Sequence, residues 1–357
     1  MPERLVEPLG LLDGDAAREA VDAGLARWLA GGPTAFTLAR LIGDAASAPI
    51  VPVGGVRVGG VSVGGVPVGG VPAGWCAALD RVAAPVPGWA GLDPARVAVM
   101  GILNVTPDSF SDGGRHAGLD SAVRAGLVLA AQGADIVDVG GESTRPGASL
   151  VAPAAEQARV VPVIRALAAH GVLVSVDTRN AATMEAALDA GAAIVNDISA
   201  LTHDPAAAPL VARRGCPVVL MHMRGTPATM GQHATYEDVA HAVVAELDAA
   251  VARAVAVGVP AENIAVDPGI GFAKTAAHNV ALLDRLSLLA NLGRRVLVGL
   301  SRKAFVGRLT GVTAPWERDA GSLALGLRAV TAGASVLRVH DVAGTVQALR
   351  TRAVLPV

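Results

Sequence analysis

Short apolar runs alternate with longer amphipathic stretches through most of the chain, from residue 97 onward. The runs are rich in Val, Ile and Leu, which is typical of strands that are buried on both faces of a parallel sheet. They occupy residues 97–104, 135–141, 172–177, 193–197, 217–222, 263–267, 296–302 and 335–340. The stretches between them have helical patterns, at approximately 119–132, 152–169, 179–190, 205–214, 236–257, 276–291, 317–332 and 342–351.

Eight strands that alternate strictly with eight helices predict an α/β fold, the (β/α)8 TIM barrel. An open, doubly wound parallel sheet is the structural alternative. No Gly-x-Gly-x-x-Gly motif follows the first strand, and its absence favours the barrel.

The first 95 residues have a different pattern. Asp13 and Asp15 precede an amphipathic stretch, which predicts a helix over residues 13–30, and a second short helix is predicted over 34–42. Residues 51–75 repeat a five-residue Val/Gly pattern, in which Gly-Gly interrupts any strand.

We interpret the repeat as a flexible, low-complexity linker. A few short irregular strands are the alternative, because Val favours β structure. The predicted organisation is an N-terminal helical extension (1–50), a Val/Gly/Pro-rich repeat and linker (51–95) and the barrel (96–357).

Composition narrows the functional classes. The net charge of −2 argues against a basic nucleic-acid surface, so we expect no nucleic-acid partner. Two cysteines cannot make a disulfide framework, which favours a reducing cytoplasm. The first ten residues lack a signal pattern, and no apolar run is long enough to cross a membrane, so we expect a cytoplasmic protein with no membrane partner.

Lysine is rare in this chain. Only Lys274 and Lys303 occur among 29 basic residues, and all the others are arginines. An Arg-rich coding bias explains this by chance survival; the alternative is that both positions need a compact ammonium group.

Every predicted strand ends in a polar group. In a TIM barrel these carboxyl ends surround the active site. The groups are Asn104, Glu142 to Arg145, Asp177, Asn196 and Asp197, His222, Asp267, Ser301 to Lys303, and Arg338, His340 and Asp341. Helix capping explains one or two of them, but a shared ligand site explains all eight strand ends.

The first half of this rim is rich in acceptors. Asp177, Asn196 and Asp267 suit a flat heterocycle with several N–H donors, such as a pterin. A buried polar network without a ligand is the alternative reading.

The second half of the rim is cationic. Arg145, Lys303, Arg338 and His340 suit a phosphate or pyrophosphate. Asn104, together with Asp108 and Asp112, is suited to help hold a hard cation beside that anion. A heterocycle and a pyrophosphate without a Walker or Rossmann motif indicate a leaving group rather than a nucleotide cofactor.

Two loops directly follow the first two strands, at residues 104–114 and 141–148, and both are rich in Gly, Pro, Ser and Thr. Ordinary turn chemistry is one explanation; mobile lids over the substrates are the other. Phe110 lies in the middle of the first loop, which favours a lid that covers an apolar surface.

These segments resemble dihydropteroate synthase, the sulfonamide-inhibited enzyme family of folate biosynthesis. The matching motifs are MGILNVTPDSFSDGG (100–114), GGESTRPGA (140–148), SVDT (175–178), IVNDIS (194–199), LMHMRG (220–225), DPGIGFAK (267–274), SRK (301–303) and RVHDV (338–342). They follow the eight strands in order, and the resemblance covers residues 97–349. Both lysines fall inside these motifs, which favours a required role.

The resemblance implies a pterin-binding TIM barrel, expected to be a Mg²⁺-dependent homodimer. Its transferase reaction joins 6-hydroxymethyl-7,8-dihydropterin pyrophosphate to 4-aminobenzoate, with release of pyrophosphate and formation of 7,8-dihydropteroate. The implied roles are as follows: Asp177, Asn196, Ile198, Met221, Asp267 and Lys303 bind the pterin; Arg145, Arg338 and His340 bind pyrophosphate and, with Lys303, are catalytic; Phe110, Thr144, Pro146, Phe272 and Ser301 surround 4-aminobenzoate; and Asn104 ligates the metal.

Ile270 and Ala273 depart from the family motif, in which a second Phe and a Gly are expected. We expect these changes to alter shape rather than chemistry. Two alternative functions remain at this point: a pterin-dependent methyltransferase module, which does not need the anion site, and a non-catalytic pterin-binding paralogue.

Overall fold

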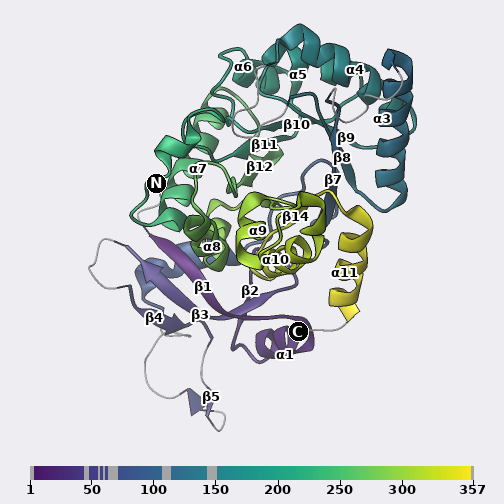
Figure 1. Cartoon of the computed structure of the whole chain (residues 1–357). Helices are drawn as coiled ribbons and strands as arrows, with labels where there is room; N and C mark the ends of the chain where they lie inside the picture. Colours follow the sequence, from purple (N-terminus) through teal and green to yellow (C-terminus); the bar gives the residue numbers. More distant parts are fainter. Residues whose placement is uncertain are drawn as a thin grey trace.

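The chain folds around a closed barrel of eight parallel strands (Figure 1). The computed structural model describes residues 4–43, 48–54, 57–58, 61–62, 71–106, 114–142 and 151–354. In barrel order the strands are β7 (Ala98–Asn104), β8 (Ile136–Gly140), β9 (Val174–Asp177), β10 (Ile194–Asp197), β11 (Val218–Met221), β12 (Ile264–Asp267), β13 (Arg295–Gly299) and β14 (Val336–Val339), with β14 paired to β7. The predicted TIM barrel is confirmed.

Helices surround the barrel and cover the outer faces of its strands (Figure 1). They are α3 (Gly114–Ala131), α4 (Pro153–Ala169), α5 (Ala181–Asp189), α6 (Ala207–Arg214), α7 (Val239–Ala256), α8 (Ala276–Asp284), α9 (Ala304–Thr310), α10 (Asp319–Thr331) and α11 (Val342–Val354). The sixth predicted helix is divided between α8 and the 3-10 helix η5 (Leu286–Leu292), and α9 is an addition that the pattern did not predict. Shorter 3-10 turns are η3 (Met230–His233), η4 (Ala261–Asn263) and η6 (Pro315–Glu317).

Apolar packing has two layers, as strands buried on both faces require. The outer faces of the strands pack against the helices with Val, Leu and Ala side chains, among them Val137, Val139 and Val176. Inside the barrel, Met100, Ile136, Ile194, Val219, Ala265, Leu297 and Val336 form a separate cluster near the amino ends of the strands. Polar site residues therefore lie only toward the carboxyl ends.

Trp89 closes the amino end of the barrel. Its side chain is 2% exposed and packs in the inner cluster with Met100 and Leu297. Its indole Nε1 donates a hydrogen bond to the carbonyl oxygen of Asn263 at 2.9 Å. The segment that precedes the first barrel strand thus completes the barrel core.

The N-terminal segment is built mainly from strands. An antiparallel sheet contains β1 (Leu5–Leu12), β3 (Ala35–Ile42), β2 (Arg27–Trp28) and β4 (Ile50–Pro52), and a separate hairpin contains β5 (Arg57–Val58) and β6 (Val61–Ser62). The helices are α1 (Gly14–Asp22), η1 (Ala73–Trp75) and α2 (Cys76–Ala83). Figure 1 places this sheet beside the barrel.

The prediction of a helical extension is therefore wrong for most of its length. Residues 34–42, predicted as a helix, form β3, because this segment pairs with β1 and buries Phe36 and Ala39 in the sheet core. The predicted helix over 13–30 ends at Asp22, and β2 follows it. In the repeat, β4, β5 and β6 are short strands, which was the alternative to a linker.

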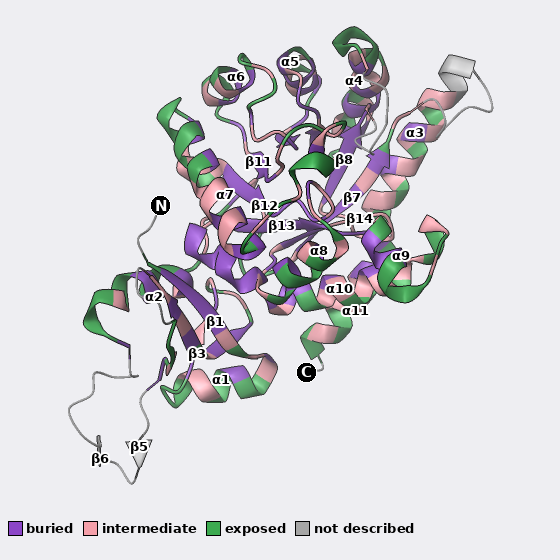
Figure 2. Cartoon of the chain, turned by 60° about the vertical axis from the view of Figure 1, so that its left-hand side comes forward, coloured by how far each residue is buried: buried purple, intermediate pink, exposed green. Residues whose placement is uncertain are grey.

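Buried polar contacts join this sheet to the barrel. Asn291 on η5 is 3% exposed; it accepts a hydrogen bond from the backbone N–H of Val6 at 3.0 Å and donates one to the Val6 carbonyl at 2.7 Å. Glu7 is equally buried between Arg40 and Arg285. In Figure 2, β1 and β3 combine buried and intermediate residues, with half of each strand buried, so the extension is an integral layer of the molecule.

None of the helices in the described part of the chain combines the length and the apolarity that a membrane span requires.

Candidate functional site

A charged cluster occupies the carboxyl end of the barrel. Asp177 ends β9, Asp267 ends β12, and Arg338 lies near the end of β14. The guanidinium Nη2 of Arg338 contacts Asp177 Oδ2 at 2.6 Å, across the barrel interior. Because Asp177 and Arg338 are 161 positions apart, the closed sheet is what brings them together.

Asp138 is a member of this cluster that the sequence analysis missed. It lies inside β8, two residues before its end, and is fully buried. Its Oδ2 accepts hydrogen bonds from Arg338 Nε at 2.7 Å and from Asn196 Nδ2 at 3.1 Å. A signal was present: Asp138 alternates with the outward-packed Val137 and Val139, so its side chain had to point into the barrel.

Arg338 forms the centre of the cluster. Burial disfavours its charge, but Asp138 and Asp177 outweigh this effect and raise the pKa of Arg338. Its Nε and Nη2 are both used by carboxylates, and its side chain remains 20% exposed. The Arg338 guanidinium therefore contacts the carboxylates of Asp138 and Asp177, and part of the side chain remains accessible to solvent.

Burial dominates the titration of the carboxylates. It raises the pKa of Asp177 to about 7; Arg338 opposes the rise, and Asp138, Glu156 and Asp197 add to it. Burial also raises the pKa of Asp267, while Lys303 and the backbone N–H of Gly269 oppose the rise. Asp177 is thus placed to exchange protons near neutral pH, and the pKa of Asp267 is shifted in the same direction.

Lys303 joins the acceptor half of the site to an aromatic ring. Burial lowers the pKa of Lys303 to about 8, and the neighbouring Asp267 opposes this shift. Its Nζ donates to the carbonyl of Ile270 and lies 4.7 Å from the centre of the Phe272 ring, a cation–π contact. The Asp267 carboxylate, the Lys303 ammonium group and the Phe272 ring therefore lie next to one another.

Lys274 stabilises the loop between β12 and α8. Its Nζ lies 2.9 Å from His222 Nδ1 and donates to the carbonyls of Gly269 at 3.0 Å and Phe272 at 3.1 Å. Burial lowers the pKa of Lys274 to about 7. His222 is in turn bonded to Glu246 at 3.0 Å. The two lysines thus have different places: Lys303 lines the charged cluster and Lys274 supports the loop.

Ser301 and His340 lie together beside the cluster. His340 Nδ1 is 3.0 Å from Ser301 Oγ, which also accepts a hydrogen bond from the His340 backbone N–H at 3.2 Å. Ile198 and Met221 are buried at the ends of β10 and β11. Asn104 is exposed at the end of β7.

Four of the expected site residues lie outside the described residues: Phe110, Thr144, Arg145 and Pro146. The same holds for Asp108 and Asp112. In the part of the chain that is described, His, Cys, Asp and Glu nowhere form a cluster of three suited to a metal ion. A single amide such as Asn104 nevertheless fits Mg²⁺, which keeps several waters and takes its remaining ligands from substrate phosphates.

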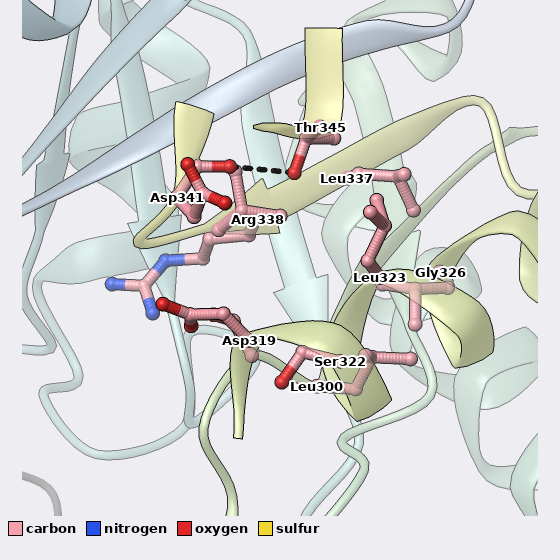
Figure 3. Close-up of a pocket in the computed structure, with 12 residues that line it drawn as sticks. Leu300, Asp319, Ser322, Leu323, Gly326, Leu337, Arg338, Asp341 and Thr345 are labelled. Carbon is pink, nitrogen blue, oxygen red and sulfur yellow. Dashed lines mark hydrogen bonds between the residues drawn. The ribbon is translucent and has the colours of Figure 1, made fainter. Parts of the chain in front are cut away.

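A small cavity lies behind the cluster, between β13, β14 and α10 (Figure 3). Thr345 donates a hydrogen bond to the Asp341 carbonyl at 2.6 Å on one side of it. Figure 3 shows the guanidinium of Arg338 directed away from the apolar side chains Leu323 and Leu337. The cavity thus lies mainly on the helix side of β14, and Ser301 and Arg338 are the expected site residues that also line it.

The sequence matches the pterin binding enzyme family model over residues 100–340. It is 49% identical to the dihydropteroate synthase of Mycobacterium leprae over 262 residues, which are 72% of this chain and 92% of that protein. The chain belongs to the dihydropteroate synthase family.

Solved structures of dihydropteroate synthases have the same fold. The Xanthomonas albilineans enzyme with 4-aminobenzoic acid matches with a TM-score of 0.68 and 49% identity, over 72% of this chain and 92% of that one. The enzyme of the same organism in complex with 7,8-dihydropteroate matches with a TM-score of 0.68 and 45% identity, over 75% and 97%.

These findings confirm the predicted family, and with it a transferase of folate biosynthesis. They do not favour the methyltransferase module or the non-catalytic paralogue. The matches cover the barrel and leave most of the N-terminal extension outside.

Proposed function

We propose that this barrel joins 6-hydroxymethyl-7,8-dihydropterin pyrophosphate to 4-aminobenzoate, forming 7,8-dihydropteroate and pyrophosphate. The supporting observation is the cluster itself: the buried carboxylates of Asp177 and Asp267 face the cations Arg338 and Lys303 at one end of the barrel. Acceptors for a heterocycle thus adjoin cations for an anionic leaving group.

The pterin lies against Asp177, Asn196 and Asp267, with Ile198 and Met221 packed beside it. Asn196 Nδ2 is engaged by Asp138, which leaves its Oδ1 to accept a hydrogen bond from a pterin N–H. Asp177 and Asp267 accept hydrogen bonds best when ionised, and the adjacent Arg338 and Lys303 favour that state.

The leaving pyrophosphate lies against Arg338, His340 and Arg145, with Asn104 as the protein ligand of Mg²⁺. When bound, Mg²⁺ supplies positive charge that stabilises the leaving pyrophosphate. The partly exposed guanidinium of Arg338 is oriented by Asp138 and Asp177 before the anion arrives. Such preorganised charge acts directly on the transition state.

The 4-aminobenzoate lies against Phe272, Ser301, Phe110, Thr144 and Pro146. The cation–π contact holds Phe272 beside Lys303. Lys303 thus contacts both the pterin subsite and the 4-aminobenzoate subsite, and the two substrates meet beside it. This placement makes Lys303 a shared boundary between the two substrates.

The reaction breaks the bond between the pterin methylene carbon and the pyrophosphate oxygen, and pyrophosphate leaves with the electron pair. The amine nitrogen of 4-aminobenzoate then forms the new bond to carbon and gives up one proton to solvent. The arylamine is a weak nucleophile, so C–O cleavage runs ahead of attack. Positioning of the amine supplies much of the remaining acceleration.

The active protein is proposed to be a cytoplasmic homodimer, in keeping with the family resemblance. Sedimentation equilibrium of the purified full chain tests the dimer; a single species at the mass of one chain, 35.6 kDa, would contradict it.

Pyrophosphate release tests the function directly. The purified chain is incubated with the dihydropterin pyrophosphate and Mg²⁺, with and without 4-aminobenzoate. We expect pyrophosphate release that depends on 4-aminobenzoate and equals the dihydropteroate formed. Pterin binding without any release would contradict the proposal and restore the binding paralogue.

A further inference from the structure

Asp138 has the most buried position in the charged cluster, and none of the roles predicted from the sequence motifs falls on it. Its side chain is 0% exposed, inside β8 and below the rim on which Asp177 and Asp267 lie. A buried carboxylate is costly unless its partners compensate the desolvation, so its retention calls for a physical reason.

One oxygen of Asp138 connects two proposed substrate-binding residues. Oδ2 accepts hydrogen bonds from Arg338 Nε at 2.7 Å and from Asn196 Nδ2 at 3.1 Å. The first contact fixes the rotation of the guanidinium, whose Nη2 is then directed to Asp177. The second decides which end of the Asn196 amide faces the substrate. A pterin-binding amide and an anion-binding cation therefore share one anchor.

The other oxygen of Asp138 is buried without a hydrogen-bond partner among the described residues. An unsatisfied buried carboxylate oxygen lowers folding stability. A group retained for stability alone would have both oxygens satisfied. The geometry thus indicates that the charge and the two contacts of Oδ2 are retained for the site.

We propose that Asp138 is a positioning residue for the reaction: through one carboxylate oxygen it orients Asn196 for the pterin and Arg338 for the pyrophosphate. This inference rests on the proposed function. Asp138 also adds negative charge beside Asp177, which is faced in addition by Glu156 on α4, Asp197 on β10, Arg338 on β14 and Lys303 after β13.

The decisive variant is Asp138→Asn, which has nearly the same shape. With its oxygen at the position of Oδ2 it retains both hydrogen bonds and loses only the charge, and its NH2 takes the place of the unpaired oxygen. Because repulsion by Asp138 contributes to the raised pKa of Asp177, that pKa falls in the variant. The acid limb of kcat/KM for the pterin substrate should therefore move to lower pH.

We expect kcat/KM for the pterin substrate to fall by about 10- to 100-fold at pH 8, because the neutral amide accepts the two hydrogen bonds more weakly than the carboxylate and no longer pairs with the charge of Arg338. The KM for 4-aminobenzoate should stay unchanged, because the hydrogen bonds of Asp138 among the described residues go to Arg338 and Asn196 and not to Phe272 or Ser301. Affinity for 6-hydroxymethylpterin, measured by calorimetry, should fall in parallel.

Ser175→Ala is the matched control. Ser175 lies opposite Asp138 on β9, is equally buried and also has an unpaired oxygen, but makes no side-chain hydrogen bond to Arg338 or Asn196. It should behave as wild type in kinetics, binding and pH profile. If Asp138→Asn does not fold, Asp138→Ser, which leaves room for water, replaces it.

An unchanged acid limb together with wild-type pterin affinity in the folded variant would overturn the inference. A fall in unfolding free energy with unchanged kinetics would assign Asp138 a purely structural role and also overturn it. If the wild type binds 6-hydroxymethylpterin but makes no dihydropteroate, the proposed function fails, and the calorimetric comparison still decides the role of Asp138.

Discussion

Burial displaces the pKa of several site residues toward neutrality. Asp177 titrates at about 7, Lys274 at about 7 and Lys303 at about 8, each mainly because its charged form is desolvated. These three groups therefore change protonation between about pH 6 and pH 9. The same desolvation makes these residues a cost to the folded state.

We expect Asp177→Asn to stabilise the protein at alkaline pH. The folded-state pKa of Asp177 is raised from 3.8 to about 7, so its favourable contribution is complete below pH 3.8 and is lost as the pH rises through 7. Urea unfolding at pH 8 should show a gain on the order of 1 kcal/mol, which disappears near pH 4. Pterin binding should be lost.

Asp189→Asn is the control, because its carboxylate is 62% exposed in an ion pair with Arg214. It should change stability little at either pH. If Asp177→Asn is no more stable than the wild type at pH 8, the ion pair of Asp177 with Arg338 in the wild type outweighs the desolvation of the Asp177 carboxylate.

Ala273 occupies a backbone conformation that favours glycine. Its φ is 49°, in the left-handed region, and its side chain is 2% exposed. The departure from the family motif at this position thus carries strain. We expect Ala273→Gly to raise the free energy of unfolding by about 0.5 kcal/mol, because relief of the strain exceeds the added chain entropy.

Ala190→Gly provides the comparison, since Ala190 is also buried but has a φ of −85° at the end of α5. Guanidinium unfolding should show that this variant is destabilised. If Ala273→Gly is destabilised to the same extent, strain at Ala273 is excluded.

At the scale of elements, the loop between β12 and α8 depends on one buried ammonium group. Lys274 joins the Gly269 and Phe272 carbonyls to His222 and, through it, to Glu246 on α7. A polar connection between two helix–strand units therefore holds the loop that carries Phe272.

Lys274→Met should loosen this loop. The variant keeps the length of the side chain and removes all three hydrogen bonds, so Phe272 loses its fixed position beside Lys303. We expect the KM for 4-aminobenzoate to rise by about tenfold, with a smaller change for the pterin substrate, in steady-state kinetics. Val280→Ala, at a position 43% exposed on α8, is the control and should leave both values unchanged.

Asn291 connects the extension sheet to the barrel by pairing with both backbone groups of Val6. Asn291→Ala leaves these two buried groups without partners, so the free energy of unfolding should fall by about 2–4 kcal/mol in urea. Gln347→Ala, on the exposed side of α11, should stay within about 0.5 kcal/mol of wild type. A similarly small effect at Asn291 would show that the extension contributes little to stability.

On the scale of the whole molecule, the extension and the barrel share a core. Trp89 fills the amino end of the barrel, while the charged cluster occupies the carboxyl end. The two ends serve different purposes: one stabilises the fold and the other carries the chemistry.

Trp89→Ala should lower the stability of the fold without changing the chemistry at the carboxyl end of the barrel. Removing the buried ring leaves a cavity at the amino end and should lower the free energy of unfolding by about 3–5 kcal/mol, with kcat nearly unchanged where the protein remains folded. Trp316→Ala is the matched control, because that ring is 69% exposed. A loss of kcat without a loss of stability would contradict this division.

Periodicity and strand-end chemistry were sufficient to predict the barrel and most of its rim. Strands buried on both faces must be continuously apolar, and polar groups at their carboxyl ends must meet once the sheet closes. The sequence therefore predicts that Asp177, Asn196, Asp267, Lys303 and Arg338 lie together at one end of the barrel.

Contacts between distant segments were not encoded in any local pattern. Residues 34–42 are compatible with a helix or a strand, and pairing with β1 selects the strand. Val6 meets Asn291 across 285 positions, and Asp138 meets Arg338 across 200. Closure of the barrel determines the second pair, because the register of eight strands decides which side chains share the interior. Packing of β1 against η5 determines the first pair.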